Sequence, residues 1–354
     1  MANPFRSEAE KKIFSRLFGK SLKHFYEYLN IKKLIAWLVE RDLINKINFM
    51  QRRKFIQNFS LISAAATLPK LSQAESVKKK KYFTSAFISD IHIKPSEIAE
   101  GGMQKALQNI NQLKQQPDFI INGGDSIMDG LAADKEKTKA QWDLFNKIMQ
   151  AENKLPVKHC IGNHDIWGWQ LKADIKNDPL YGKALWLQQT GYNKTWYSFT
   201  HNNWHFIFLD SVQENNGGYI ALLDDEQFNW LQNELEANKE KFICIVSHIP
   251  IMSFCSAMFF KDMLPNGDWK LSRALLHTDA RKIKDLFKKY INIKCCLSGH
   301  IHLQDEVNYL GIKYFCNGAI SGNWWNGPFQ DFAPAYALFD FYIDGSVERT
   351  MVEY

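Results

Sequence analysis

The chain has 354 residues, enough for one large domain or two modest ones, and its 45% hydrophobic and 23% charged residues are ordinary for a globular protein. Its net charge of +6 is unevenly spread, because residues 1–49 carry +5, residues 50–74 carry +4 and residues 75–354 carry −3. The basic excess belongs to the N-terminal stretch, so the body of the chain gives no electrostatic case for binding nucleic acid.

Residues 1–49 contain two basic, amphipathic stretches, 10–29 and 31–47. Such stretches are typical of helices that lie on a membrane surface or bind a partner. The alternative is that translation starts at Met50 and that this extension is not part of the natural protein.

Residues 50–74 are predicted to form an export signal. They combine an arginine pair and a short apolar run with the small-residue site "LSQA", which predicts cleavage after Ala74. The stretch "QRRKFIQ" resembles the twin-arginine motif S/T-R-R-x-F-L-K, with Arg52 and Arg53 as the pair, Phe55 in the aromatic place and Gln57 in place of lysine. A general secretory signal and a plain basic helix are the alternatives.

The expected location is therefore periplasmic or secreted, and the export machinery is an expected partner. Any membrane contact is expected within residues 1–74, and residues 75–81 form the linker to the body of the chain.

From Tyr82 onward, short apolar runs alternate with amphipathic ones, which predicts an α/β fold. Strands are expected within 82–90, 117–125, 155–165, 241–250 and 291–302, with a hairpin over 195–211. Helices are expected over 101–116, 135–150, 223–238 and 279–290.

The six cysteines form no recognisable disulfide or zinc pattern. Most lie in apolar, strand-like runs, where a cysteine is typically a small buried hydrophobic residue; these are Cys160, Cys244, Cys295, Cys296 and Cys316.

Polar residues gather at the carboxyl ends of five strand-like runs, where ligands collect in open α/β sheets. The segments are "SDIH" (Asp90, His92), "GGDS" (Asp125), "GNHD" (Asn163, His164), "SHIP" (His248) and "SGHIH" (His300, His302). In extended backbone, residues i and i+2 point the same way, so Asp90 is expected to act with His92 and His300 with His302. The glycines at 123, 124, 162 and 299 are expected to allow tight turns with unusual φ.

These segments resemble the pattern of the calcineurin-like metallophosphoesterase superfamily: D-x-H, G-D, G-N-H-[DE], H and G-H-x-H. The resemblance runs from about Tyr82 to Ile343. It implies a catalytic domain over 82–354 that folds as a four-layer α/β/β/α sandwich, with two divalent metal ions at one edge. The implied ligands are Asp90, His92 and His302 for the first ion, Asn163, His248 and His300 for the second, and Asp125 as the bridge.

Mixed carboxylate, imidazole and amide ligands suit Mn, Fe or Zn, and two such ions can activate a water and orient a phosphate. The resemblance makes His164 the acid that contacts the phosphate or protonates the leaving group, with Asp165 orienting its imidazole. A helix or turn cap is the alternative role for Asp165.

Departures within the superfamily narrow the resemblance. His92 and Met128 stand where purple acid phosphatases have glycine and tyrosine, and "GDSIMDG" lacks the arginine of protein Ser/Thr phosphatases. Among the groups of the superfamily, the chain is most similar in these motifs to the bacterial class III cyclic-nucleotide and glycerophosphodiester phosphodiesterases. The expected function is hydrolysis of a small phosphodiester; phosphomonoester hydrolysis and a non-catalytic interaction module are the alternatives, and the complete ligand set argues against the module.

Two pairs of tryptophans are noted: Trp167 with Trp169 directly after the "GNHD" motif, and Trp324 with Trp325 after a predicted strand end. Their rings are candidates to stack on a base or to cover a lipid or glycerol group of the substrate. The alternative is that they pack long loops onto the domain.

Overall fold

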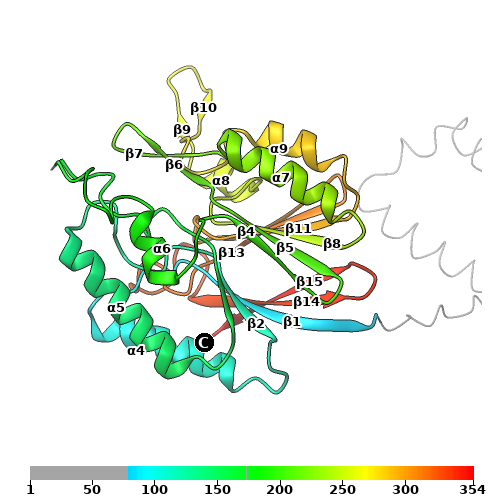
Figure 1. Cartoon of the computed structure of the whole chain (residues 1–354), viewed down its shortest axis with the longest axis horizontal. Helices are drawn as coiled ribbons and strands as arrows, with labels where there is room; N and C mark the ends of the chain where they lie inside the picture. Colours follow the sequence, from blue (N-terminus) through cyan, green and yellow to red (C-terminus); the bar gives the residue numbers. More distant parts are fainter. Residues whose placement is uncertain (1–78, 173) are drawn as a thin grey trace, which may run out of the picture. The chain divides into compact units, whose positions relative to one another are not determined.

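The computed structural model describes residues 79–172 and 174–354 (Figure 1). The predicted N-terminal extension, export signal and first residues of the linker, 1–78, lie outside the described residues. The described residues belong to one compact unit, Lys78–Tyr354. Among them, no helix is both long and apolar enough to cross a membrane.

The helices and strands follow one another in the alternating order that the sequence predicts. The helices are α4 (Glu97–Asn111), α5 (Lys135–Glu152), α6 (Ala184–Thr190), α7 (Asp225–Ala237), α8 (Phe254–Phe259) and α9 (Ala280–Phe287). The strands are β1 (Lys81–Ile88), β2 (Phe119–Asn122), β3 (Val157–His159), β4 (Tyr197–His201), β5 (Trp204–Leu209), β6 (Val212–Asn215), β7 (Gly218–Ala221), β8 (Phe242–Ser247), β9 (Asp262–Met263), β10 (Trp269–Lys270), β11 (Ile293–Ser298), β12 (Gln304–Tyr309), β13 (Ile312–Asn317), β14 (Ala335–Tyr342) and β15 (Val347–Glu353).

Two large sheets form the centre of the unit. The first has the strand order β15-β14-β1-β2-β3 and the second β12-β13-β11-β8-β5-β4. Strands β1, β2 and β3 run parallel to one another, as do β5, β8, β11 and β13. The remaining neighbouring pairs in the two sheets are antiparallel. The carboxyl ends of the parallel strands therefore meet at one edge of each sheet, as the strand-end motifs require.

The alternation of side chains along the strands builds four layers. On β1, Ala86 and Ile88 join the apolar cluster that contains α4 and α5, whereas Phe83 and Phe87 join the cluster between the two sheets. On β5 of the second sheet, Phe206 likewise packs between the sheets, whereas Ile207 and Leu209 pack with residues of α7 and α9. Figure 1 shows the helices on the two outer faces, which confirms the predicted α/β/β/α sandwich.

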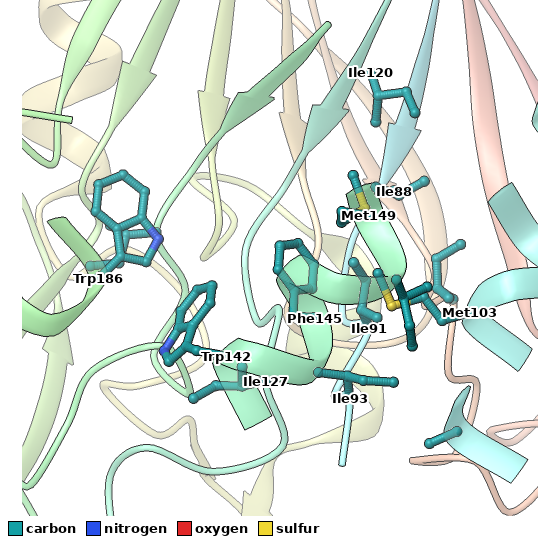
Figure 2. Packing of buried hydrophobic residues seen from close by; sticks show 14 of the residues in the cluster. Ile88, Ile91, Ile93, Met103, Ile120, Ile127, Trp142, Phe145, Met149 and Trp186 are labelled. Carbon is teal, nitrogen blue, oxygen red and sulfur yellow. The ribbon is translucent and has the colours of Figure 1, made fainter. Parts of the chain in front are cut away.

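Helices α4 and α5 cover the first sheet with one apolar face each. The side chain of Asp134 accepts a hydrogen bond from the Lys137 amide and so caps α5 at its start. Trp142, Phe145 and Met149 of α5 then recur at helical spacing and pack on the sheet (Figure 2). This packing fixes the helices behind the strands whose ends carry the polar motifs.

The six cysteines are free and buried, as predicted for the five in apolar runs. Several elements were not predicted: α6, α8, the small hairpins β6–β7 and β9–β10, and the last four strands. Strand β14 lies between β1 and β15, so the chain's C-terminal part completes the first sheet.

Candidate metal centre

The strand-end residues of both sheets converge at one place. Three groups of side chains have donor atoms within 4.8 Å of one another, in a geometry that could hold a metal ion. They are Asp90 with His92 and His302, His92 with Asp125 and His164, and Asp125 with His248 and His300. Because neighbouring groups share His92 or Asp125, they form one continuous centre, and six of the seven predicted metal ligands belong to it.

The backbone at this centre is left-handed where extended backbone was expected. Asp90, His92, Asp125, His300 and His302 have φ of 54°, 48°, 54°, 71° and 56°. Such values are uncommon in residues other than glycine and persist only where the surroundings hold them. The expected i, i+2 pairing is therefore wrong for the two C-terminal histidines, which join different groups: His302 lies with Asp90, and His300 lies with Asp125.

Hydrogen bonds between neighbouring loops hold this backbone in place. The Asp90 amide donates to the Gly124 carbonyl and the His92 amide to the Asp125 carbonyl, both at 3.0 Å. The His300 amide donates to the Asp90 carboxylate at 3.0 Å. Each loop is thus fixed by another loop of the centre, so the strain is shared among them.

The first donor group is built around two imidazoles that face each other. The Nε2 atoms of His92 and His302 are 3.0 Å apart, and Oδ1 of Asp90 lies 3.5 Å from Nε2 of His302. The Nδ1–H of His302 donates to the Gly322 carbonyl at 2.6 Å, which leaves its Nε2 as an acceptor. Three acceptor atoms therefore point toward a common position.

The second donor group is built around Asp125. Its Oδ2 lies 3.2 Å from Nε2 of His248 and 3.7 Å from Nε2 of His92, so one oxygen lies between the two groups. The Nδ1 of His248 bonds to the Gly123 carbonyl at 2.8 Å, and the Nε2 of His300 bonds to the Ala274 carbonyl at 2.9 Å. When the ring is neutral, the remaining nitrogen of each histidine is an acceptor.

Three buried polar atoms of the predicted ligands have no hydrogen-bond partner among the described residues: Nδ1 of His92, Oδ1 of Asn163 and Nε2 of His248. All three residues are almost fully buried. Leaving such atoms unsatisfied is costly, and a cation would satisfy the Asn163 oxygen and the His248 nitrogen. The donor set, with its buried carboxylates and imidazoles, therefore fits divalent metal ions, and Asn163 stays a prediction as the seventh ligand.

The charges at the centre follow from burial and from the carboxylates. Burial, together with the nearby His164, lowers the pKa of His92 well below its usual value. Burial, together with the nearby His248, lowers the pKa of His300 to about 3. Both rings are therefore neutral near pH 7. Burial also opposes charge on Asp125 and His248, but their mutual attraction outweighs it: the pKa of Asp125 falls well below its usual range and that of His248 rises to about 9. Metal binding at His248 would therefore release a proton.

Glycines of these motifs make room for the ligands. A Cβ on Gly162 would collide with the amide and carboxylate of Asp125, and one on Gly299 would collide with the carboxylate of Asp90. Of the four glycines for which an unusual φ was expected, Gly124 has it, at 104°. For Gly162 and Gly299, close approach of a ligand side chain is the reason instead.

His164 lies at the centre and is partly exposed, as is the predicted ligand His300, whereas the other predicted ligands are buried. Its amide donates to Oδ1 of Asp125 at 2.8 Å, and its Nδ1 bonds to the Met128 carbonyl at 2.5 Å. The ring therefore presents its Nε2 to the side where a substrate can reach it.

Asp165 does not have the predicted role of orienting the His164 imidazole, since the carbonyl of Met128 does so. The Asp165 carboxylate is buried and accepts hydrogen bonds from the amides of Gly162, Asp125 and Ser126 at 2.8, 3.0 and 2.8 Å. Burial and the nearby Asp125 raise its pKa to about 7. Asp165 thus ties the loop after β3 to the loop after β2, close to the turn-cap alternative.

The four candidate tryptophans separate into one at the centre and three that pack the fold. Trp167 and Trp169 are buried in the core under the first sheet, so their predicted contact with substrate is wrong. The indole N–H of Trp325 donates to the His92 carbonyl at 3.1 Å and its ring fills the space beside Gly102. The ring of Trp324 lies 4.3 Å from that of His302.

Two further aromatic residues lie at the centre and were not predicted. The ring of Phe329 is 5.7 Å from that of His302 and 5.5 Å from that of Trp324, and the ring of Tyr219 is 6.3 Å from that of His300. Phe329 is in the loop of the "NWWNGP" segment, which offered a weak signal; Tyr219 is in a hairpin that was not predicted.

The chain is similar in sequence to several known phosphoesterases. A human protein named serine/threonine-protein phosphatase CPPED1 is 21% identical over 61% of this chain and 63% of its own length, so the chain spans under two thirds of that relative. A probable cyclic nucleotide phosphodiesterase of Ruthia magnifica is 26% identical over 64% of this chain and 81% of its own. The 3',5'-cyclic adenosine monophosphate phosphodiesterase CpdA of Haemophilus influenzae is 25% identical over 62% and 69%.

The fold is also similar to that of a solved dimetal phosphatase from Danio rerio, with a TM-score of 0.55 at 14% identity over 78% of this chain and all of that one. The model of the family described as calcineurin-like phosphoesterase matches residues 83–304, which include all seven predicted ligands. The chain therefore belongs to the calcineurin-like phosphoesterase family, whose members are metal-dependent phosphoesterases.

Proposed function

We propose that this protein hydrolyses small phosphodiesters, cyclic nucleotides or glycerophosphodiesters, with two divalent metal ions. The observation that carries the proposal is the position of the Asp125 carboxylate between two donor groups, within 3.7 Å of His92 and 3.2 Å of His248. The names of two bacterial relatives, both cyclic nucleotide phosphodiesterases, support the choice of a diester.

The residues of the two donor groups would hold the ions in the arrangement that the sequence predicts. Asp90, His92 and His302 would hold the first, Asn163, His248 and His300 the second, and Asp125 would bridge them. Two such ions, when bound, supply an activated water and stabilise charge on the attacking and leaving oxygens. The mix of nitrogen and oxygen donors favours Mn, Fe or Zn.

His164 would move the proton of the reaction. Its Nδ1 is engaged by the Met128 carbonyl, so Nε2 is the atom that carries the transferable proton when the ring is charged. That atom lies within reach of the Asp125 and His92 donor atoms, where the phosphate would sit. His164 would thus protonate the leaving oxygen.

Trp324 would form one wall of the substrate site. Its ring lies over His302 and 5.9 Å from that of His92, and its φ of 47° is strained for a bulky residue. A flat or apolar group on the phosphate could pack on this ring.

Monoester hydrolysis is the second candidate, because the human relative is named a protein phosphatase. The test is a panel of cyclic nucleotides, glycerophosphodiesters, a bis-aryl phosphodiester and matching monoesters, assayed with the Mn-loaded chain. The proposal predicts that kcat/KM is higher for the diesters. A preference for monoesters by tenfold or more would contradict it.

We also propose that the enzyme works in the periplasm or outside the cell, after export in the folded state. The support is the twin-arginine pattern at Arg52 and Arg53. Folding before export suits a centre whose ligands come from separated strand ends, since such ligands converge only in the native state.

A further inference from the structure

A long connection between β8 and α9, residues 252–276 (the arm), adjoins the metal centre along both of its limbs. On the outgoing limb, the Ser253 hydroxyl and the Cys255 amide donate to Asp305 at 2.8 Å, three residues after His302. On the returning limb, the Ala274 carbonyl accepts a hydrogen bond from His300. Figure 1 shows the β9–β10 hairpin of the arm projecting away from the sheets.

The arm exposes five large apolar side chains. The exposed fractions are 62% for Phe254, 56% for Phe259, 65% for Met263, 37% for Leu264 and 54% for Trp269. Exposed apolar residues are ordinary when scattered, but a group of them on one short segment marks a binding surface. The arm is therefore a surface that some ligand or partner should cover.

Aromatic contacts connect the metal centre to the arm. The ring of Trp324 packs on His302, that of Phe329 lies 5.5 Å from Trp324, and that of Phe260 stacks on Phe329 at 6.3 Å and 17°. Phe260 directly follows α8 and leads into the β9–β10 hairpin. We call this series of rings the aromatic path.

We propose that the aromatic path and the arm receive the hydrocarbon part of an amphiphilic phosphoester whose phosphate lies at the metal centre. This proposal rests on the proposed function and adds to it the class of substrate. A ligand that covers both the centre and the arm needs a phosphate at one end and an apolar group at the other. Residues 254–273 contain three basic and two acidic side chains, so their charges nearly cancel. The arm therefore selects for apolar character more than for charge.

The test uses p-nitrophenyl alkyl phosphates with alkyl groups from methyl to octyl, kept below the concentration at which they form micelles. All of them release the same leaving group, so the chemical step is held constant. A methylene buried on one side gains about half of the full transfer free energy, so kcat/KM should rise about twofold per methylene in the full-length chain.

The matched variants separate the arm from exposed apolar residues elsewhere. A triple variant, Phe259→Ser with Met263→Ser and Trp269→Ser, should keep wild-type activity on the methyl ester and lose the dependence on chain length. A control variant, Ile98→Ser with Ile291→Ser, removes side chains that are 69% and 92% exposed away from the arm and should keep that dependence.

Turnover of the methyl ester with no dependence on chain length in the wild type would overturn the proposal and leave the phosphodiesterase function standing. Equal dependence in the wild type and the triple variant would also overturn it. A wild-type dimer that the triple variant breaks, with unchanged chain-length dependence, would assign the arm to a second copy of the chain. Failure to hydrolyse even the methyl ester would count against the proposed function itself.

Discussion

At the scale of single residues, the centre separates side chains that would hold metal from one that would act on the substrate. The predicted ligands Asp90, His92 and Asp125 are almost fully buried and point acceptor atoms inward. His164 is partly exposed, with one ring nitrogen held by a carbonyl and the other directed to the centre. The predicted ligand His300 is also partly exposed and also has one ring nitrogen held by a carbonyl, so exposure alone does not separate a ligand from the acid, and a substitution is needed to do so.

His164→Ala should therefore keep its metal content and lose about 10²- to 10⁴-fold in kcat, the usual contribution of a positioned acid or base. The loss should be smaller for a p-nitrophenyl ester, because its leaving group needs little protonation, than for a glycerophosphodiester. Metal analysis and kinetics on both substrates check this. If the variant loses its metals as well, His164 holds the centre together and is not the acid.

At the scale of elements, the loops after the strands are packed so closely that glycine is needed for ligand geometry. In the loop after β11, Gly299 lies against the carboxylate of Asp90, which follows β1 of the other sheet. The contact between Gly299 and Asp90 is steric, so a substitution of the glycine can test it without removing a ligand.

Gly299→Ala should displace Asp90 and weaken metal binding by about 10- to 100-fold, the usual effect of disturbing a residue that supports a ligand. Equilibrium dialysis against Mn²⁺ measures it. Gly101→Ala is the control, because a Cβ there has no heavy atom within 4 Å and alanine suits a helix. Equal metal affinity in the two variants would show that Asp90 tolerates the added carbon.

Strand β3 ends in a histidine, His159, whose surroundings disfavour its charged form. The Asn122 amide hydrogen-bonds to Nδ1 of His159 at 3.2 Å, and burial, with Lys158 nearby, lowers the pKa of His159 to about 4. Between pH 6.5 and 4 the unfolded chain binds this proton more readily than the folded one, so the free energy of unfolding should fall as pH falls through this range.

His159→Gln should remove part of that acid destabilisation. Urea unfolding of the metal-free wild type and variant at pH 7 and pH 5 tests it, and the wild type should lose more stability over this interval. Parallel losses in both proteins would mean that His159 does not contribute to acid sensitivity.

At the scale of the whole molecule, the two sheets each supply part of the metal centre. Asp90, His92, Asp125 and Asn163 follow strands of the first sheet, whereas the other three ligands follow β8 and β11 of the second. Ligands separated by more than 200 positions in sequence meet only when the sheets are packed. Metal binding should therefore stabilise the sandwich as a unit.

If the centre is assembled before export, the signal must act on a folded chain. Arg52→Lys with Arg53→Lys should leave active, metal-bound precursor in the cytoplasm, because the twin-arginine route requires its arginine pair. Cell fractionation with an activity assay measures this. Undiminished export of the double variant would point to the general secretory route.

Apolar strands and the polar residues after them have local signatures, so the sequence predicts the α/β alternation and the strand ends that meet at the centre, whereas the four layers and the ligand assignment were implied by the family resemblance. It does not predict the left-handed backbone at Asp90 or His302, which contacts between distant loops impose. Trp167 follows a site motif and Trp324 a predicted strand end, and only packing places the first in the core and the second at the centre. The edge strand β12 is polar apart from Val307 and Tyr309, so it offered little strand signal.

The central claim is that one carboxylate, that of Asp125, joins two metal ions. The most direct test is the Mn²⁺ stoichiometry of the chain, measured by equilibrium dialysis for the wild type, Asp125→Ala and Asn163→Ala. We expect two ions per wild-type chain, loss or loosening of both ions in Asp125→Ala, and weakened binding of the second ion alone in Asn163→Ala. Hydrolysis of a bis-aryl phosphodiester should fall in parallel. A single ion in the wild type, or full activity in metal-stripped Asp125→Ala, would contradict the central claim.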